Sequence, residues 1–261
     1  MEEQNISIVS DVIFAIGPIG ITNSVLAFWA TLLLIFGFVI YIRSHLALVP
    51  NRWQVAAEGI VEYLDDLLTQ QFSDRRLARR FLPFMVGLFL FILIANQFSV
   101  LPLLQSITVS DRPLTYLFRT PTADLGFPFV MAFIVILFGQ IIALSTAPLK
   151  HIGNYFKIAP LLKARSVSDF FMALVDFFLG LLDIVGEFAK IISLSGRLFG
   201  NVLAGELMII IISGMVAYAV PLPFFALSLL SGIIQTLVFV LLSIGFLSNT
   251  INAVEPEGAT A

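Results

Sequence analysis

The sequence contains no cysteine and only two histidines, and each shortage excludes a kind of site. Without cysteine the chain has no disulfide, no thiolate metal ligand and no cysteine nucleophile. His45 and His151 both fall in polar segments that we expect to be loops, so neither a haem ligand pair nor a zinc cluster is indicated. The sequence also lacks a GxxxxGK[ST] phosphate loop and any Ser/His/Asp arrangement typical of hydrolases. We therefore expect no cofactor and no metal.

Charge is scarce as well. Charged residues make up 12% of the 261 residues, whereas hydrophobic residues make up 59%. Soluble domains average about 25% charged and about 45–50% apolar residues. The composition therefore predicts an integral membrane protein. Because the sequence shows no internal repeat, low-complexity tract or soluble appendage, we expect one membrane domain over residues 1–261.

Three apolar runs are long enough to cross a bilayer, whose hydrocarbon core takes about 20 helical residues. They cover about residues 24–42, 81–104 and 126–147. Between the first two runs, residues 53–72 place apolar and acidic side chains at helical spacing. This pattern predicts an amphipathic helix that lies at the membrane surface between the first and second spans.

Proline is absent between Pro160 and Pro221, which leaves an unusually long helical tract. The tract covers the 48 residues 168–215, and its length of ~72 Å is more than twice the ~30 Å hydrocarbon thickness. It must break near its glycines or lie strongly inclined. After a turn at Pro221 and Pro223, residues 224–251 run back. We expect an all-α protein with about five membrane-embedded helices, the last two forming an inclined hairpin.

Basic residues are concentrated in two polar segments. Ten of the 14 lysines and arginines lie in residues 43–80 and 150–165. Because cytoplasmic loops carry the excess of basic residues, both segments are predicted to face the cytoplasm or its equivalent. The N-terminus then lies outside and the C-terminus inside.

The first arm of the hairpin carries charges at intervals of seven residues: Asp169, Asp176, Asp183, Lys190 and Arg197. A step of seven residues shifts only about 20° around a helix, so these charges form one slowly winding row. Glu187, four residues after Asp183, lies beside the row. Asp183, Glu187 and Lys190 either form salt links with one another or line a water-filled path from the cytoplasmic side. Both alternatives stay open.

Arg197 is the most unusual charge, because it lies deep in the arm and a long apolar run follows it. Glu206 comes nine residues later, which places it on the opposite face and ~13.5 Å along the axis. The two side chains therefore cannot neutralise each other. Arginine stays protonated at any workable pH. Arg197 either snorkels to an interface or needs a carboxylate from another segment or another protein.

Polar residues in the other membrane segments are candidates for the same site. Asn201 lies one turn after Arg197, and Ser228 and Gln235 share one face of the returning arm. Antiparallel packing would bring Gln235 near Arg197, although hydrogen bonding between helices explains a buried glutamine equally well. Asn96 in the second span is either a packing residue or a channel-lining one.

Several motifs together resemble one family over nearly the whole chain. SLSGRLFGNVLAGE, followed by an apolar run, a proline turn and GIIQTLVFVLLSIGFLS, resembles subunit a of the rotary F-type ATP synthases. ITNSVLAFWATLLL, VPNRWQVAAEGIVEY, FLFILIANQFSVLP and TADLGFPFVMAF are similar to further parts of that family. The RLFGN…AGE element with its downstream glutamine is the most specific of these.

The resemblance implies a stator subunit with two offset aqueous half-channels that load and unload ions, which we expect to be protons. Arg197 would face a rotating ring of c subunits, favour the ionised form of each passing carboxylate and so ease ion release. It would also block leakage between the half-channels. Glu206 would belong to the outer half-channel and, with less support, Asp183 to the inner one. Asn201 and Gln235 match polar positions near the arginine.

The resemblance also implies partners and a location. The chain would be a non-catalytic subunit of the complex that synthesises ATP. It would contact the c-subunit ring, the b subunits of the peripheral stalk, the rest of the complex and the lipid bilayer, and no nucleic acid. The acidic start MEEQNISIVSDVIF lacks a basic presequence. This favours a bacterial plasma (inner) membrane, with the mitochondrial inner membrane as the alternative.

Two positions depart from the family pattern, and one of them is Ser99, where some relatives have an acid in the second span. Some bacterial relatives have a histidine where this chain has Ser228, and Gly205 does not replace it. Proton relay in the outer half-channel would then depend on Glu206, water and other acids such as Asp124.

Two other functions stay open on the sequence. The chain could be a self-contained transporter or channel that uses Arg197 to bind an anionic substrate, although no inverted repeat supports this. It could also be a membrane scaffold in which Arg197 is an assembly contact.

Overall fold

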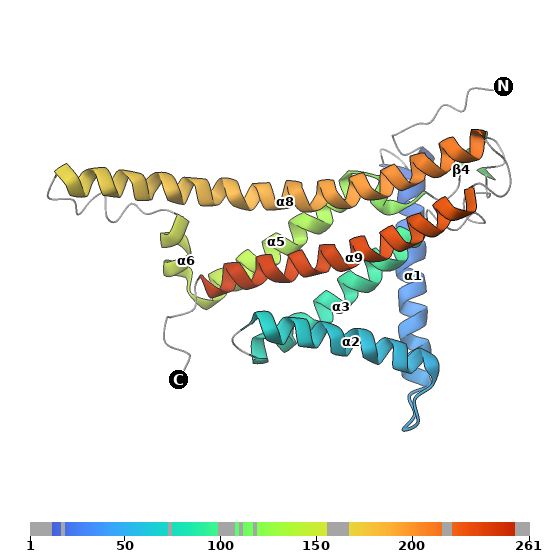
Figure 1. Cartoon of the computed structure of the whole chain (residues 1–261), viewed down its shortest axis with the longest axis horizontal. Coiled ribbons are helices and arrows are strands. Elements are labelled where there is room, and N and C mark those ends of the chain that lie inside the picture. Colours follow the sequence, from blue (N-terminus) through green and yellow to red (C-terminus); the bar gives the residue numbers. More distant parts are fainter. Residues whose placement is uncertain are drawn as a thin grey trace. The chain divides into compact units, whose positions relative to one another are not determined.

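The structure is a computed structural model of the chain, and it describes residues 12–16, 19–72, 75–98, 108–109, 112–116, 119–155, 167–215 and 221–253. Most of these residues are helical (Figure 1). The helices are α1 (Asn23–Ser44), α2 (Arg52–Gln71), α3 (Arg75–Gln97), α5 (Gly126–Thr146), α6 (Pro148–Tyr155), α8 (Val167–Met215) and α9 (Pro221–Asn252). The prediction of a helical membrane protein is confirmed.

Two short β-hairpins accompany the helices, and the sequence analysis did not predict them. β1 (Val12–Ile16) pairs antiparallel with β2 (Ile19–Thr22), and β3 (Thr108–Val109) pairs antiparallel with β4 (Arg112–Tyr116). A single 3₁₀ turn, η1 (Pro121–Ala123), lies between β4 and α5. Both hairpins flank helices of the membrane domain: β2 leads directly into α1, and β3 and β4 lie in the connection from α3 to α5.

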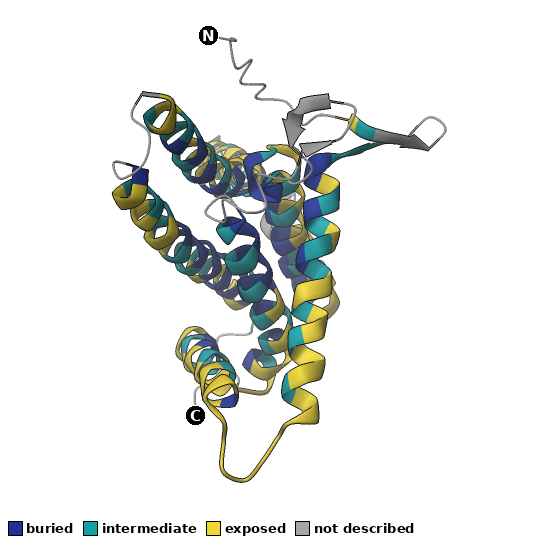
Figure 2. Ribbon diagram, turned by 90° about the vertical axis from the view of Figure 1, so that its right-hand side faces the viewer, coloured by how far each residue is buried: buried dark blue, intermediate teal, exposed yellow. Residues whose placement is uncertain are grey.

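Four of the described helices are long and apolar enough to cross a membrane: α1, α3, α5 and α9. α1 is apolar on nearly all its faces, and only 11% of its most apolar window is buried inside the protein. Figure 2 shows this exposure along the half of α1 that leads to α2. A helix that is apolar all round suits a lipid surrounding. The fifth membrane-embedded helix stays a prediction.

Two helix boundaries differ from the sequence-based ones. α3 begins at Arg75 rather than near residue 81, so its first turns carry the arginines that were assigned to a polar segment. Residues 99–104 of the predicted second span lie outside the described residues. α9 begins at Pro221, so the predicted turn at Pro221 and Pro223 is wrong. Proline fits the first turn of a helix because the backbone N–H it lacks would have no partner there.

The long tract is one unbroken helix. α8 has 49 residues, which at 1.5 Å per residue is a length of ~73.5 Å. Of the two possibilities left by the sequence, a break near the glycines is therefore excluded for this tract. A helix of this length fits within a ~30 Å core only if it is strongly inclined, and the inclination itself stays a prediction.

The chain divides into two compact units, and α5, α8 and α9 contribute to both. The first unit contains residues 1–128 and 196–241. Its centre is α3, which packs against α1 and α2. Leu64 and Leu68 of α2 are buried against this side, whereas the other faces of α2 remain largely exposed. The helix predicted for residues 53–72 is therefore present, and its place at the membrane surface stays a prediction.

Aromatic packing holds α1 and α3 to the start of α5 in the first unit. The rings of Phe28, Phe91 and Phe127 lie with centroids 5.3–5.5 Å apart. Such tilted pairs add about 0.5–1.5 kcal/mol each beyond the area they bury. This packing holds the C-terminal end of α3, where Asn96 lies.

The second unit contains residues 129–195 and 242–261. Here α5 approaches α9 so closely that a Cβ atom at Gly139 would come within 2.8 Å of Leu247 Cδ2. Small residues are common where membrane helices pack closely. The division into two compact units does not test whether the chain forms a single membrane domain, which stays a prediction.

Candidate functional site

Asn96 is the centre of a buried polar network in the first unit. Its side chain is 2% exposed. Asn96 Oδ1 accepts a hydrogen bond of 2.9 Å from the hydroxyl of Thr122, which lies in η1. Asn96 Nδ2 donates to Thr236 Oγ1 and to the Gly232 carbonyl, both at 3.3 Å. The network therefore ties α3 and η1 to the middle of α9.

Gly232 allows this approach because it has no side chain. A Cβ atom there would lie 3.2 Å from Gln97 Nε2 and 3.4 Å from Asn96 Cβ. The Gly232 carbonyl also accepts a hydrogen bond of 2.8 Å from the Thr236 hydroxyl. The role of Asn96 in packing is thus documented by three hydrogen bonds, and a role in ion conduction stays a prediction.

A second polar contact joins α8 to α9. The Ser231 hydroxyl donates a hydrogen bond of 2.8 Å to Asn201 Oδ1. One turn along, a Cβ atom at Gly205 would lie 3.0 Å from Ser228 Oγ, so the two helices meet there through a glycine. These contacts run antiparallel, which confirms the predicted hairpin for this part of the two helices.

A cavity of about 260 Å³ lies beside these contacts. Its polar lining comes from Asn96, Asn201, Ser228 and Ser231, and its apolar lining includes Val202 and Met208. Since one water takes ~30 Å³ in the liquid, the cavity has room for several. Ser228, the position at which the resemblance led us to expect a histidine in some relatives, is one of the lining residues.

Arg197 and Glu206 lie on opposite faces of α8, as the nine-residue spacing predicted. Arg197 is exposed. Glu206 is 9% exposed and lies on the buried face with Leu198 and Val202. Among the described residues, the Arg197 guanidinium forms no hydrogen bond and no ion pair. The cation is therefore presented outward, away from the rest of the first unit.

The buried Glu206 carboxyl has two polar neighbours in the segment that precedes η1. Thr120 and Arg119 both act on it electrostatically. Thr120 is almost fully buried, at 1% exposure. Burying a carboxyl without partners is costly, and these two side chains reduce that cost. Neither neighbour could be predicted from the sequence, because they lie 86 and 87 residues before Glu206.

The register of the helix pair places Gln235 at the level of Arg197. The hydrogen bond between Asn201 and Ser231 sets the register, and one turn further on each antiparallel helix stand Arg197 and Gln235. Gln235 is 8% exposed, and its Nε2 is buried without a hydrogen-bond partner among the described residues. The register supports the predicted nearness of the two residues.

The acids of the first half of α8 lie in the second unit. Glu187 Oε1 forms an ion pair with Lys190 Nζ at 2.6 Å. The same ammonium lies 5.6 Å from the centre of the Phe246 ring. Of the two alternatives, a salt link is therefore present between Glu187 and Lys190. Asp183 is exposed and acts electrostatically on Tyr155.

A further polar group in this unit was missed by the sequence analysis. His151, expected in a loop, lies in α6 and is 7% exposed. Its Nε2 is 2.7 Å from Gln140 Oε1, and Gln140 Nε2 donates to the Tyr155 hydroxyl at 3.1 Å. Burial lowers the pKa of His151, and the Glu187 charge opposes this effect. The i, i+4 spacing of His151 and Tyr155 could have placed the two side chains on one helix face, but it could not have predicted Gln140 as their shared partner.

Asp124 has a structural partner. Its Oδ1 accepts a hydrogen bond of 3.3 Å from the backbone N–H of Gly126, the first residue of α5. A carboxylate in this position satisfies a free N–H at the start of a helix. A part for Asp124 in proton relay stays a prediction.

These features define a class of protein: a multispanning helical membrane protein whose two long helices carry an outward-facing arginine and a buried acid. Beside these helices lies a cavity with polar lining residues that is large enough for water. The family model described as ATP synthase A chain matches residues 25–248. The chain therefore belongs to the ATP synthase A chain family.

Full-length relatives agree with this. The chain is 29% identical over 241 residues to ATP synthase subunit a of Moorella thermoacetica, covering 92% of this chain and 95% of that protein. It is 27% identical over 255 residues to ATP synthase subunit a 2 of Bradyrhizobium sp. (strain BTAi1), covering 96% and 98%. It is also 25% identical over 229 residues to ATP synthase subunit a 1 of Hahella chejuensis, covering 88% and 84%.

Proposed function

We propose that this chain is the stator subunit of an F-type ATP synthase membrane sector and that it carries protons to and from a rotating c-subunit ring. The single observation that supports this most is the exposed Arg197, which has no partner among the described residues and lies on a helix of the matched family region. A permanent cation in an apolar segment needs a carboxylate, and the ring would supply one.

Arg197 would act by electrostatics. A fixed guanidinium beside a ring carboxylate favours the ionised form, so the proton leaves as the carboxylate passes. The same cation repels protons that would otherwise pass directly between the half-channels. Gln235, level with Arg197, would support the arginine from within the protein, because its side-chain amide is buried rather than open to the ring.

Two groups of polar residues would form the half-channels. On the outer side the buried Glu206 would pass protons along the path, and water in the cavity that Asn201, Ser228 and Asn96 line would form a separate part of it. Asp124 would contribute at the mouth. On the inner side, Asp183 would lie at the entrance, with Glu187 held by Lys190. The chain itself would catalyse no reaction.

The proposed partners are the c-subunit ring, the b subunits of the peripheral stalk and the surrounding lipid. The proposed location is a bacterial plasma membrane, or the mitochondrial inner membrane as the alternative, with the N-terminus outside and the C-terminus inside.

The test is proton pumping driven by ATP in inverted membrane vesicles that contain the assembled complex. Arg197→Ala should abolish pumping while the complex still assembles. Arg52→Ala removes another exposed arginine, at the start of α2, and should leave pumping intact. Unimpaired pumping by Arg197→Ala would reject the proposal. Anion uptake by the purified single chain, lost in the same variant, would instead indicate the transporter function.

A further inference from the structure

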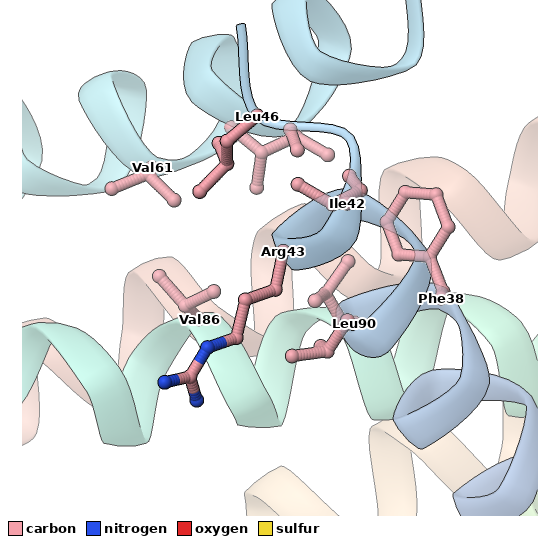
Figure 3. A pocket seen from close by; sticks show the side chains of 10 residues that line it. Phe38, Ile42, Arg43, Leu46, Val61, Val86 and Leu90 are labelled. Atoms are coloured by element: carbon pink, nitrogen blue, oxygen red, sulfur yellow. The ribbon is translucent and has the colours of Figure 1, made fainter.

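A second cavity lies in the first unit, away from the proposed proton path. It has a volume of about 240 Å³ and lies where the end of α1 meets α2 and α3 (Figure 3). Its apolar lining includes Phe38 and Ile42 of α1, Val61 of α2, and Val86 and Leu90 of α3. Arg43 is the only charged residue in the lining.

Arg43 spans the pocket rather than pointing away from it. Figure 3 shows its side chain extending from α1 toward Val86, with the guanidinium at the edge of the apolar space. Arg43 is exposed, and among the described residues it forms no ion pair and no hydrogen bond through its side chain. Because the lining contains no carboxylate, the protein itself supplies no counter-charge there.

A further cation follows the same face of α3. Arg79 lies seven residues before Val86 and eleven before Leu90, so it shares their stripe within about 20° and lies ~10 Å from Val86 along the axis. Arg79 is exposed. The apolar pocket therefore leads to a pair of cations at the end of the helices that is predicted to face the cytoplasm.

We propose that this pocket is a binding site for an anionic phospholipid, with one acyl chain against the apolar lining and the phosphate on Arg43. Arginine matches phosphate oxygens with two parallel hydrogen bonds. Basic pockets between membrane helices on the cytoplasmic side suit anionic headgroups, and that leaflet is rich in them. Arg79 is placed to meet a second anionic group. The site is independent of the proposed function, since it contains none of the proton-path residues.

The experiment measures lipid retained by the purified full-length chain, using native mass spectrometry. The chain is titrated with phosphatidylglycerol or with phosphatidylcholine of the same acyl chains. The wild type should retain phosphatidylglycerol about fivefold better, the ratio expected for one cation, Arg43, near an anionic headgroup. Inorganic phosphate at equal concentration should not displace it, because the acyl chain contributes to binding.

Three variants locate the site. Arg43→Gln should reduce the preference to near one. Arg80→Gln is the matched control, because Arg80 is equally exposed but lies about 100° round α3 from Arg79, and it should leave the preference unchanged. Ala57→Trp, which fills the pocket from α2, should reduce the retention of both lipids.

The proposal is overturned if the wild type shows no preference between the two lipids, or if Arg43→Gln keeps it. Full displacement by inorganic phosphate would also overturn it, because it would identify a bare anion site. None of these outcomes bears on pumping by the assembled complex.

Discussion

Ser231 on α9 donates a 2.8 Å hydrogen bond to Asn201 on α8. This contact defines the register of the two antiparallel helices in the first unit. One turn to one side it aligns Arg197 with Gln235. One turn to the other side, Gly205 meets Ser228. A serine–asparagine pair between membrane helices contributes only about 0.6 kcal/mol on average. Its importance is therefore the register rather than the energy.

Asn96 and Gln97 are neighbours with opposite expected effects on stability. Asn96→Leu removes the acceptor of the buried Thr122 hydroxyl and two hydrogen bonds to α9, so we expect a loss of about 1–3 kcal/mol. Gln97 has both side-chain polar atoms buried without a hydrogen-bond partner among the described residues. Gln97→Met should therefore be neutral or stabilising. The free energy of unfolding in detergent, titrated with SDS, measures both, and equal losses in the two variants would contradict the network.

Gly139 tests the close approach of α5 to α9 in the second unit. A larger side chain there would collide with Leu247, which is 1% exposed and has little room to move. Gly139→Leu should cost about 1–3 kcal/mol, the range for overpacking. Gly59→Leu on α2 is the matched control, because nothing lies within 4 Å of a Cβ atom there. It should gain up to about 0.8 kcal/mol from helix propensity. The same unfolding titration applies, and no difference between the two would argue against the contact.

His151 should make the stability of the chain depend on pH. Its folded pKa lies below the ordinary 6.5 because burial disfavours the charged ring. Below pH 6.5 the unfolded chain therefore binds a proton that the folded chain does not, and the free energy of unfolding falls as the pH falls. Above pH 6.5 both states are neutral and this dependence disappears.

The comparison uses the two histidines of the chain. Thermal unfolding of the helical signal, followed at pH 7.5 and pH 5.5, should show a loss at the lower pH for the wild type and for His45→Gln. His151→Gln should reduce that loss, because the titrating group is gone. A loss of the same size in His151→Gln would mean that other groups cause it.

Residues with a helical period could be placed from the sequence, whereas partners distant in the chain could not. The separation of Arg197 from Glu206 follows from 100° per residue alone, and the structure confirms it. The antiparallel return of α9 followed from the proline-free tract and the apolar run after it. The proton-path roles of Asp183, Glu187, Asn201 and Gln235 remain predictions.

Contacts through loops gave no periodic signal. Thr120 and Arg119 beside Glu206, and Thr122 on Asn96, come from a short segment whose path depends on the helices around it. The start of α9 was misplaced because proline was interpreted as a breaker, although its first-turn position is equally favourable. The predicted start of α3, near residue 81, was too late in the sequence, because a helix continues beyond its apolar part when its arginines can reach water.

The proposed function requires the exposed face of α8 around Arg197 to meet the helices of a c-subunit ring. The direct test is disulfide cross-linking in the assembled complex. One of two glycines of α8 is replaced by cysteine, and a second cysteine is placed beside the ring carboxylate. Gly200 opens to free space, whereas Gly205 faces Ser228 of α9, and the chain has no cysteine of its own. Gly200→Cys should cross-link to the ring and Gly205→Cys should not. A cross-link from Gly205→Cys but none from Gly200→Cys would contradict the claim.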